Sequence, residues 1–163
     1  MASLADNPFA ALTIVVAPAI LTNASSVLCL GTGNRIARVV DRTRLLTSEL
    51  TRLEPNSPRR ELHLRQLQRL KARSQLLLRA LRLFYTSLGS FAAAALISIF
   101  GAVLADFAGP VTFNVIASLG LFSGTVGVAG IVGGCTLMVH ETRLAVRNLE
   151  EEMKFLEHPH DAR

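Results

Sequence analysis

The sequence predicts an all-α membrane protein with three transmembrane helices, a long cytoplasmic antiparallel helical hairpin between the first and the second, the N-terminus outside and the C-terminus inside. Half of the 163 residues are hydrophobic and only 18% are charged, whereas charged residues make up roughly a quarter of a soluble domain. The apolar residues cluster in three uncharged stretches, Phe9–Leu30 and Leu83–Leu104 with 22 residues each and Val111–Val139 with 29. Each is long enough to span, since about 20 residues cross the hydrocarbon core. A soluble bundle is disfavoured because its core helices would keep a polar stripe.

The distribution of basic residues predicts the orientation. All 17 Lys and Arg residues lie in two regions, 13 of them between Arg35 and Arg82 and four from Arg143 onward. The first eight residues and the link 105–110 contain none. Because Lys and Arg next to a span are retained on the cytoplasmic side, both basic regions are expected inside. The N-terminus also lacks the positive segment of a signal peptide, so we expect the first span to persist as an anchor.

These patterns divide the chain into six segments. In the basic hairpin, apolar residues recur at spacings of three and four on both arms, as in a coiled coil. Between the arms, Ser57 followed by Pro58 predicts an N-cap with proline at the first helical position. The segments are the first transmembrane helix over 9–34, the cytoplasmic basic helical hairpin over 35–82, the second transmembrane helix over 83–105, the third over 111–140, a cytoplasmic C-terminal helix over 141–157 and a loose tail over 158–163.

The third span is rich in glycine, which predicts close helix packing. Small residues four apart let helix backbones approach one another in lipid. The alternative interpretation is a gate that bends at these positions. The pattern leaves open whether the packing partner lies in the same chain. The residues are Gly120, Gly124, Gly127, Gly130 and Gly134.

The first span carries a weakly polar face that includes Thr22, Ser25, Ser26 and Cys29, with Asn23 beside it. Such a face could line a hydrated pathway in a ring of subunits. We favour helix packing, because the same face continues into the apolar seam of the hairpin, which must meet a partner helix. Asn23 is expected to make one interhelical hydrogen bond.

Three arginines, Arg35, Arg38 and Arg42, share one helical face next to the membrane. They are expected to fix the topology and to contact anionic lipid headgroups, each contributing about 1 kcal/mol of attraction. A sharper alternative is a basic ring at the inner mouth of an oligomeric pore, which would favour anions.

Absent features argue against several classes of function. No Asp, Glu, Lys or Arg lies inside a span, which disfavours a secondary transporter. Cys29 and Cys135 have no CxxC spacing and favour neither a disulfide framework nor a zinc site. The four histidines lack partners at ligand or triad spacing, so we expect no enzymatic activity, cofactor or metal. The hairpin lacks interleaved aromatic residues, and we expect no nucleic acid partner.

Three segments resemble a known family: Val16–Ile20, Asn34–Arg44 and Glu141–Leu149. The chain is similar over about residues 10–152 to a family of small bacterial three-span membrane proteins catalogued only as a domain of unknown function. The string Asn-Arg-x-x-Arg-x-x-Asp-Arg that begins at Asn34 is the most specific part. The resemblance implies the same three-span plan and a multi-pass protein of the bacterial cytoplasmic (inner) membrane. It implies no activity.

Two hypotheses of function follow from the sequence. The first is a non-enzymatic membrane protein that forms a homo-oligomer through its glycine and serine faces. Such an oligomer could be a simple ion channel whose inner mouth is basic. The second is a membrane-anchored scaffold or sensor whose cytoplasmic stalk docks a protein partner. Membrane lipids, with anionic headgroups on the cytoplasmic side, are expected partners in both.

Overall fold

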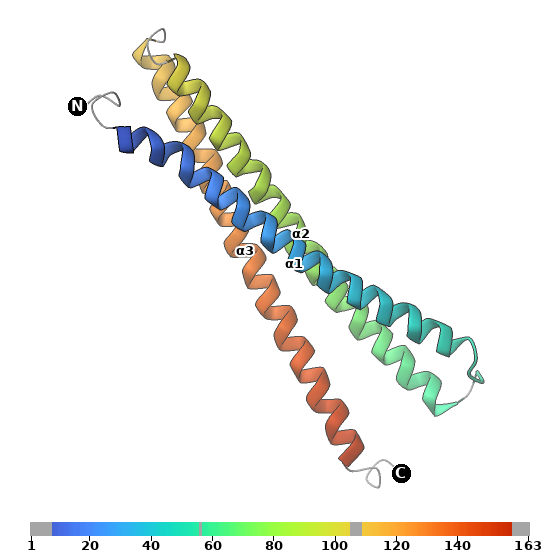
Figure 1. Cartoon of the computed structure of the whole chain (residues 1–163). Coiled ribbons are helices and arrows are strands. Elements are labelled where there is room, and N and C mark those ends of the chain that lie inside the picture. The colour runs from blue at the N-terminus through green and yellow to red at the C-terminus, as the bar shows by residue number, and fades with distance from the viewer. Residues whose placement is uncertain (1–7, 56, 105–108, 158–163) are drawn as a thin grey trace. The chain divides into compact units, whose positions relative to one another are not determined.

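A computed structural model describes residues 8–55, 57–104 and 109–157 of the chain. Within these residues the regular structure is entirely α-helical and consists of α1 (Pro8–Leu50), α2 (Pro58–Leu104) and α3 (Pro110–Glu157), as Figure 1 shows. The all-α prediction is confirmed. The predictions for the first seven residues, for 105–108 in the link between the second and third spans, and for the tail 158–163 lie outside the described residues.

Each of the three helices is long and apolar enough to cross a membrane. The candidate spans fall within Val16–Leu50, Arg59–Leu104 and Pro110–Val146. Each helix continues well beyond the roughly 20 residues that a bilayer requires. The surplus follows from the sequence, because no proline separates an apolar stretch from the basic helical segment that adjoins it. Gly31 and Gly33, which follow the first apolar stretch and could have formed a joint, lie inside the continuous helix α1.

A short turn joins α1 to α2, where the sequence predicted the break. The backbone tightens after Leu50, with the Arg52 N–H donating to the Glu49 carbonyl at 3.0 Å. The Arg60 backbone N–H then donates to Ser57 Oγ at 3.3 Å, which is the capping bond expected when Ser57 is the N-cap and Pro58 the first helical residue. The predicted cap is confirmed. α1 ends at Leu50, seven residues before the cap at Ser57.

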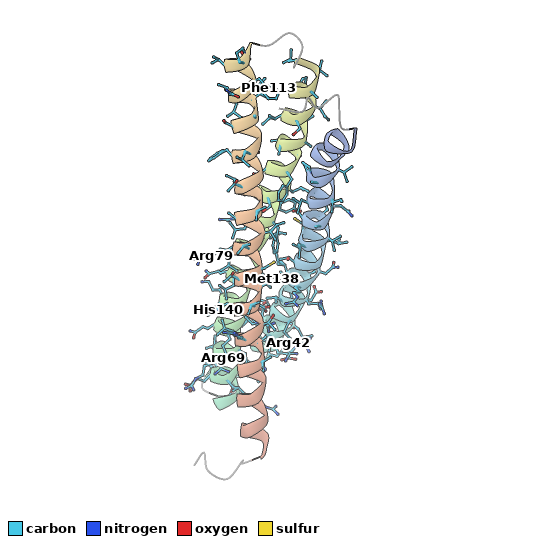
Figure 2. The ribbon with its side chains drawn as sticks, turned by 90° about the vertical axis from the view of Figure 1, so that its left-hand side faces the viewer. Arg42, Arg69, Arg79, Phe113, Met138 and His140 are labelled. Atoms are coloured by element: carbon cyan, nitrogen blue, oxygen red, sulfur yellow. The ribbon has the colours of Figure 1, made fainter. Side chains whose placement is uncertain are left out.

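The chain divides into two compact units. The apolar unit comprises residues 1–31 and 81–134, and the basic unit comprises residues 32–80 and 135–163. All Lys and Arg residues except Arg82 belong to the basic unit. Figure 2 labels three of them, Arg42, Arg69 and Arg79.

In the basic unit, the second half of α1 and the first half of α2 lie side by side (Figure 1). Val39, Leu46 and Leu77, which belong to the apolar residues that recur at spacings of three and four on the two arms, are buried. Near the turn, His63 Nε2 lies 3.1 Å from Glu49 Oε2, while His63 Nδ1 lies 2.7 Å from the Arg59 carbonyl oxygen. An apolar core and this polar contact therefore hold the two arms together.

In the apolar unit, α2 packs against the glycines of α3. A Cβ added to Gly127 would lie 2.6 Å from Phe91 Cε1, and one added to Gly134 would collide with the ring of Phe84. Phe84 and Phe91 are almost completely buried. Large rings of α2 therefore occupy the space that the missing side chains of α3 leave open, which is the contact geometry of small residues in membrane helices.

Candidate functional site: an arginine-lined pocket

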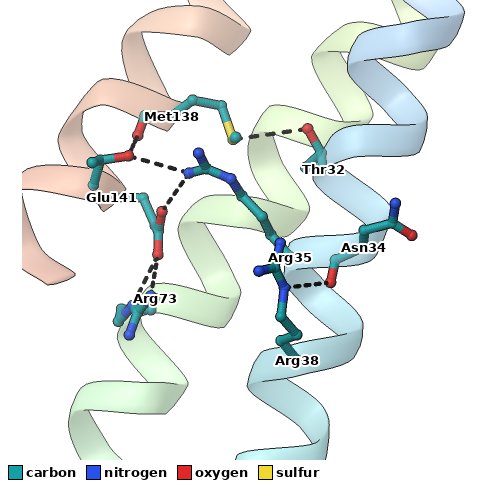
Figure 3. A network of polar contacts seen from close by, with 8 residues as sticks. Thr32, Asn34, Arg35, Arg38, Arg73, Met138 and Glu141 are labelled. Carbon is teal, nitrogen blue, oxygen red and sulfur yellow. Dashed lines mark hydrogen bonds and ion pairs between the residues drawn. The ribbon is translucent and has the colours of Figure 1, made fainter.

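The candidate site is built around one buried carboxylate, that of Glu141 on α3. Only 3% of its side chain is exposed. Glu141 Oε2 accepts from Arg35 Nη1 of α1 at 3.3 Å, and Oε1 accepts from Arg73 Nε of α2 at 2.8 Å (Figure 3). Arg73 Nη2 also lies 2.8 Å from Oε1. Both oxygens of one carboxylate thus bind guanidinium groups from two other helices, and all three helices of the basic unit meet at this point.

Neighbouring side chains fix the position of Arg35. Its Nη1 also donates to Thr142 Oγ1 at 3.2 Å, and that hydroxyl donates to the Met138 carbonyl oxygen at 2.9 Å. One turn before Arg35, the buried Thr32 places its hydroxyl 3.8 Å from Met138 Sδ (Figure 3). Because a buried charge is tolerated only when it is paired and hydrogen-bonded, these contacts explain how Glu141 remains inside the helix interface.

A pocket of about 330 Å³ opens beside this carboxylate, and four arginines line it. Arg35 and Arg73 are paired with Glu141, but Arg38 and Arg42 are not. Among the described residues, Arg38 Nε donates to the Asn34 carbonyl at 3.4 Å, and neither Arg38 nor Arg42 makes an ion pair with a carboxylate. Four guanidinium groups and one carboxylate give the lining an excess of positive charge. The lining consists of Arg35, Arg38, Val39, Arg42, Leu70, Arg73, Leu77, Glu141, Thr142 and Ala145.

Such a lining can bind an anion. Guanidinium groups form charge-assisted hydrogen bonds to carboxylate and phosphate oxygens in defined geometry. Two of the four are held by an internal carboxylate, and the other two retain N–H donors for a ligand, although Arg38 Nε donates to the Asn34 carbonyl. The described residues contain no group of three or more His, Cys, Asp or Glu side chains that could hold a metal ion.

Comparison with known proteins places the chain in a family. A family model described as "Protein of unknown function (DUF2721)" matches residues 15–151. The chain belongs to this family. The match confirms the resemblance to a domain of unknown function and covers every residue that lines the arginine pocket. No curated protein and no solved structure matches the chain.

The pocket of this DUF2721 protein contains all three arginines that the sequence singled out, and two charged residues that it did not. Arg35, Arg38 and Arg42 line one cavity with Arg73 and Glu141. One feature of the sequence could have identified Glu141 as a site residue: it is the first charged residue after the 29 uncharged residues of the third apolar stretch. No feature of the sequence could have identified Arg73, because its spacing does not distinguish it from the other basic residues of the hairpin.

The weakly polar face of α1 is divided between buried and exposed positions. Ser25 and Cys29 are buried, and Ser25 Oγ has no hydrogen-bond partner among the described residues. Thr22 is half-buried and donates to the Pro18 carbonyl at 2.8 Å. Asn23 and Ser26 are exposed. In this conformation Ser25 and Cys29 do not offer an accessible surface.

The glycines of α3 also differ from one another. Gly127, Gly130 and Gly134 face α2 at distances that leave no space for a side chain. A Cβ at Gly120 would lie 3.4 Å from Ile97 Cγ2, which is an ordinary contact, and one at Gly124 would meet nothing within 4 Å. For the first three, the packing partner lies in the same chain.

Proposed function

We propose that this DUF2721 protein is a non-enzymatic membrane sensor that binds an anionic group in its arginine pocket on the cytoplasmic side of the bacterial inner membrane. The observation that supports this function is the pocket beside Glu141, where Arg38 and Arg42 have no carboxylate partner among the described residues. Because α1, α2 and α3 all contribute to the lining, an anion bound there can contact every helix of the basic unit. Binding would stabilise their arrangement, which is the response a sensor requires.

The orientation is part of this proposal and has its own test. In a chain with Cys29 and Cys135 replaced by Ala, a Ser48→Cys variant is expected to react with a membrane-impermeant maleimide only from the cytoplasmic side, because Arg44 and Arg52 flank it in the sequence. Val111→Cys, next to the link between the second and third spans, is expected to react only from the outside. Both positions are exposed. Labelling of Ser48→Cys in intact cells would contradict the orientation.

Anion binding is tested by thermal unfolding in lipid nanodiscs. Anionic phosphatidylglycerol at ten times its dissociation constant is expected to stabilise the protein by about 1.4 kcal/mol relative to phosphatidylcholine discs. Replacing Arg38 and Arg42 by Gln should weaken this binding about tenfold or more, since each guanidinium supplies charge-assisted hydrogen bonds. The unfolding midpoint, measured as a function of lipid composition, reports both effects.

A matched control distinguishes binding in the pocket from a general attraction of anionic lipid to basic residues. Arg44 and Arg52 belong to the same unit, are exposed and do not line the pocket. The Arg44→Gln/Arg52→Gln variant removes the same charge and should keep the response to phosphatidylglycerol. Equal loss of response in both double variants would show diffuse attraction and would count against the pocket.

An ion channel between subunits has less support from the same observations. A pathway lined by the polar face of α1 needs Ser25 and Cys29 on a shared axis, but both are buried within a single chain. We therefore propose helix packing for these two residues. The homo-oligomer and the docking of a cytoplasmic protein partner stay predictions, and the mass of the particle in nanodiscs tests the first of them.

A further inference from the structure

The arginine pocket has features that narrow the class of anion it would hold. Two of its four guanidinium groups, those of Arg35 and Arg73, share the charge of Glu141. The other two, of Arg38 and Arg42, have no carboxylate partner in the part of the chain that the structure describes. The lining therefore has more than one positive charge in excess, and it would be neutralised better by a dianion than by a monoanion.

Phosphate monoesters and diesters differ in their charge and in their number of terminal oxygens. A monoester carries about −1.5 to −2 charges near neutral pH and has three terminal oxygens that accept hydrogen bonds. A diester carries a single negative charge and has two terminal oxygens. Arginine binds such oxygens in pairs, so two unpaired guanidinium groups match a terminal phosphate. A cavity of about 330 Å³ has room for a compact phosphoryl group.

The position of the pocket along each helix indicates where such a group would come from. Arg35 follows the last residue of the uncharged stretch on α1, Leu30, by five residues, or about 8 Å of helix. Glu141 follows Val139 of the uncharged stretch on α3 by two residues, or about 3 Å. The headgroup layer on each side of the hydrocarbon core is roughly 5–8 Å thick. With these stretches taken as the hydrocarbon span, Arg35 and Glu141 lie at the depth of lipid headgroups. Arg38 and Arg42 follow Arg35 by three and seven residues, or about 5 and 11 Å, and long side chains on a helix point back towards its N-terminus, which on α1 is towards the membrane.

We infer that the arginine pocket is a site for a phosphate monoester at the inner membrane surface, supplied by a lipid whose headgroup is a terminal phosphate. This inference rests on the proposed anion binding and adds the class of ligand. Arg38 and Arg42 contact the phosphate oxygens directly. Glu141 is a positioning residue, because it holds Arg35 and Arg73 at the edge of the same cavity.

The test compares two anionic lipids in the intact protein. Nanodiscs contain phosphatidylcholine with equal fractions of phosphatidic acid, a monoester, and phosphatidylglycerol, a diester, and native mass spectrometry measures which lipid stays bound. The monoester is expected to be retained about tenfold more, which corresponds to one additional charge-assisted hydrogen bond. The preference should vanish in Arg38→Gln/Arg42→Gln and persist in Arg44→Gln/Arg52→Gln.

Other outcomes overturn distinct parts of the inference. Equal retention of the two anionic lipids, both above phosphatidylcholine, would overturn the monoester class and leave anion binding intact. Retention of neither would overturn anion binding as well. In discs of phosphatidylcholine alone, glycerol 3-phosphate or inorganic phosphate should not raise the unfolding midpoint at micromolar concentration. If either does so through Arg38 and Arg42, the monoester class is supported and the lipid source is overturned.

Discussion

Replacing both Arg35 and Arg73 by Gln is expected to destabilise the basic unit by about 3–5 kcal/mol, because Glu141 would be left buried without a counter-charge. The destabilisation comes from the carboxylate of Glu141, because its side chain is only 3% exposed. The side chains of Arg35 and Arg73 are 43% and 28% exposed. Hydrogen exchange of the backbone amides in 32–50 and 58–80, measured by mass spectrometry in nanodiscs, reports the change as faster opening of the two arms.

A third substitution distinguishes the loss of the ion pairs from the loss of the arginine side chains. Adding Glu141→Gln to the double variant removes the buried charge and leaves an amide that can accept a neutral hydrogen bond from the glutamine at position 73, whose Nε2 takes the place of Arg73 Nε, so most of the lost stability should return. The Arg44→Gln/Arg52→Gln variant changes the net charge equally and should alter stability by only about 0.5 kcal/mol or less. If the triple variant is no more stable than the double variant, the proposed role of Glu141 is wrong.

Features with a local signal in the sequence were predicted, and features that depend on how helices meet were not. The apolar stretches and the cap at Ser57 and Pro58 are properties of a few consecutive residues, and the structure contains all of them. The three arginines at positions 35, 38 and 42 share one face in the sequence and line one pocket in the structure, because residues three and four apart lie on one face of any helix.

The two remaining charged members of the pocket depend on long-range geometry. Arg35 and Glu141 are separated by 106 residues, and Arg73 and Glu141 by 68. Whether such residues meet depends on the rotation of each helix about its own axis, to which side chains along the whole interface contribute. The periodicity of one helix does not contain this information. For the same reason the sequence did not predict which glycines contact α2. Gly124 and Gly130 each belong to a small-xxx-small step, but of these two only Gly130 lies against α2.

A methyl group at Gly130 is expected to destabilise the apolar unit by about 1–3 kcal/mol, the usual penalty for overpacking a close contact. A Cβ at this position would collide with Ser87 Oγ and would lie 3.0 Å from the carbonyl oxygen of Leu83. Ser87 is completely buried and donates to that same carbonyl at 2.8 Å, so its hydroxyl cannot turn away without losing a hydrogen bond. The free energy of unfolding, measured for Gly130→Ala by titration with sodium dodecyl sulfate in mixed micelles, reports this effect.

Two further variants identify the cause of the destabilisation expected for Gly130→Ala. Gly124→Ala places the same methyl group on the same helix with no atom within 4 Å, and its stability should stay within about 0.5 kcal/mol of the parent. Ser87→Gly combined with Gly130→Ala removes the colliding hydroxyl and leaves only the Leu83 carbonyl at 3.0 Å, so this pair should recover part of the loss and not all of it. A full recovery would show that the side chain alone sets the spacing of α2 and α3. No recovery would show that the two backbones set it, because the remaining contact is with a main-chain oxygen that no substitution removes.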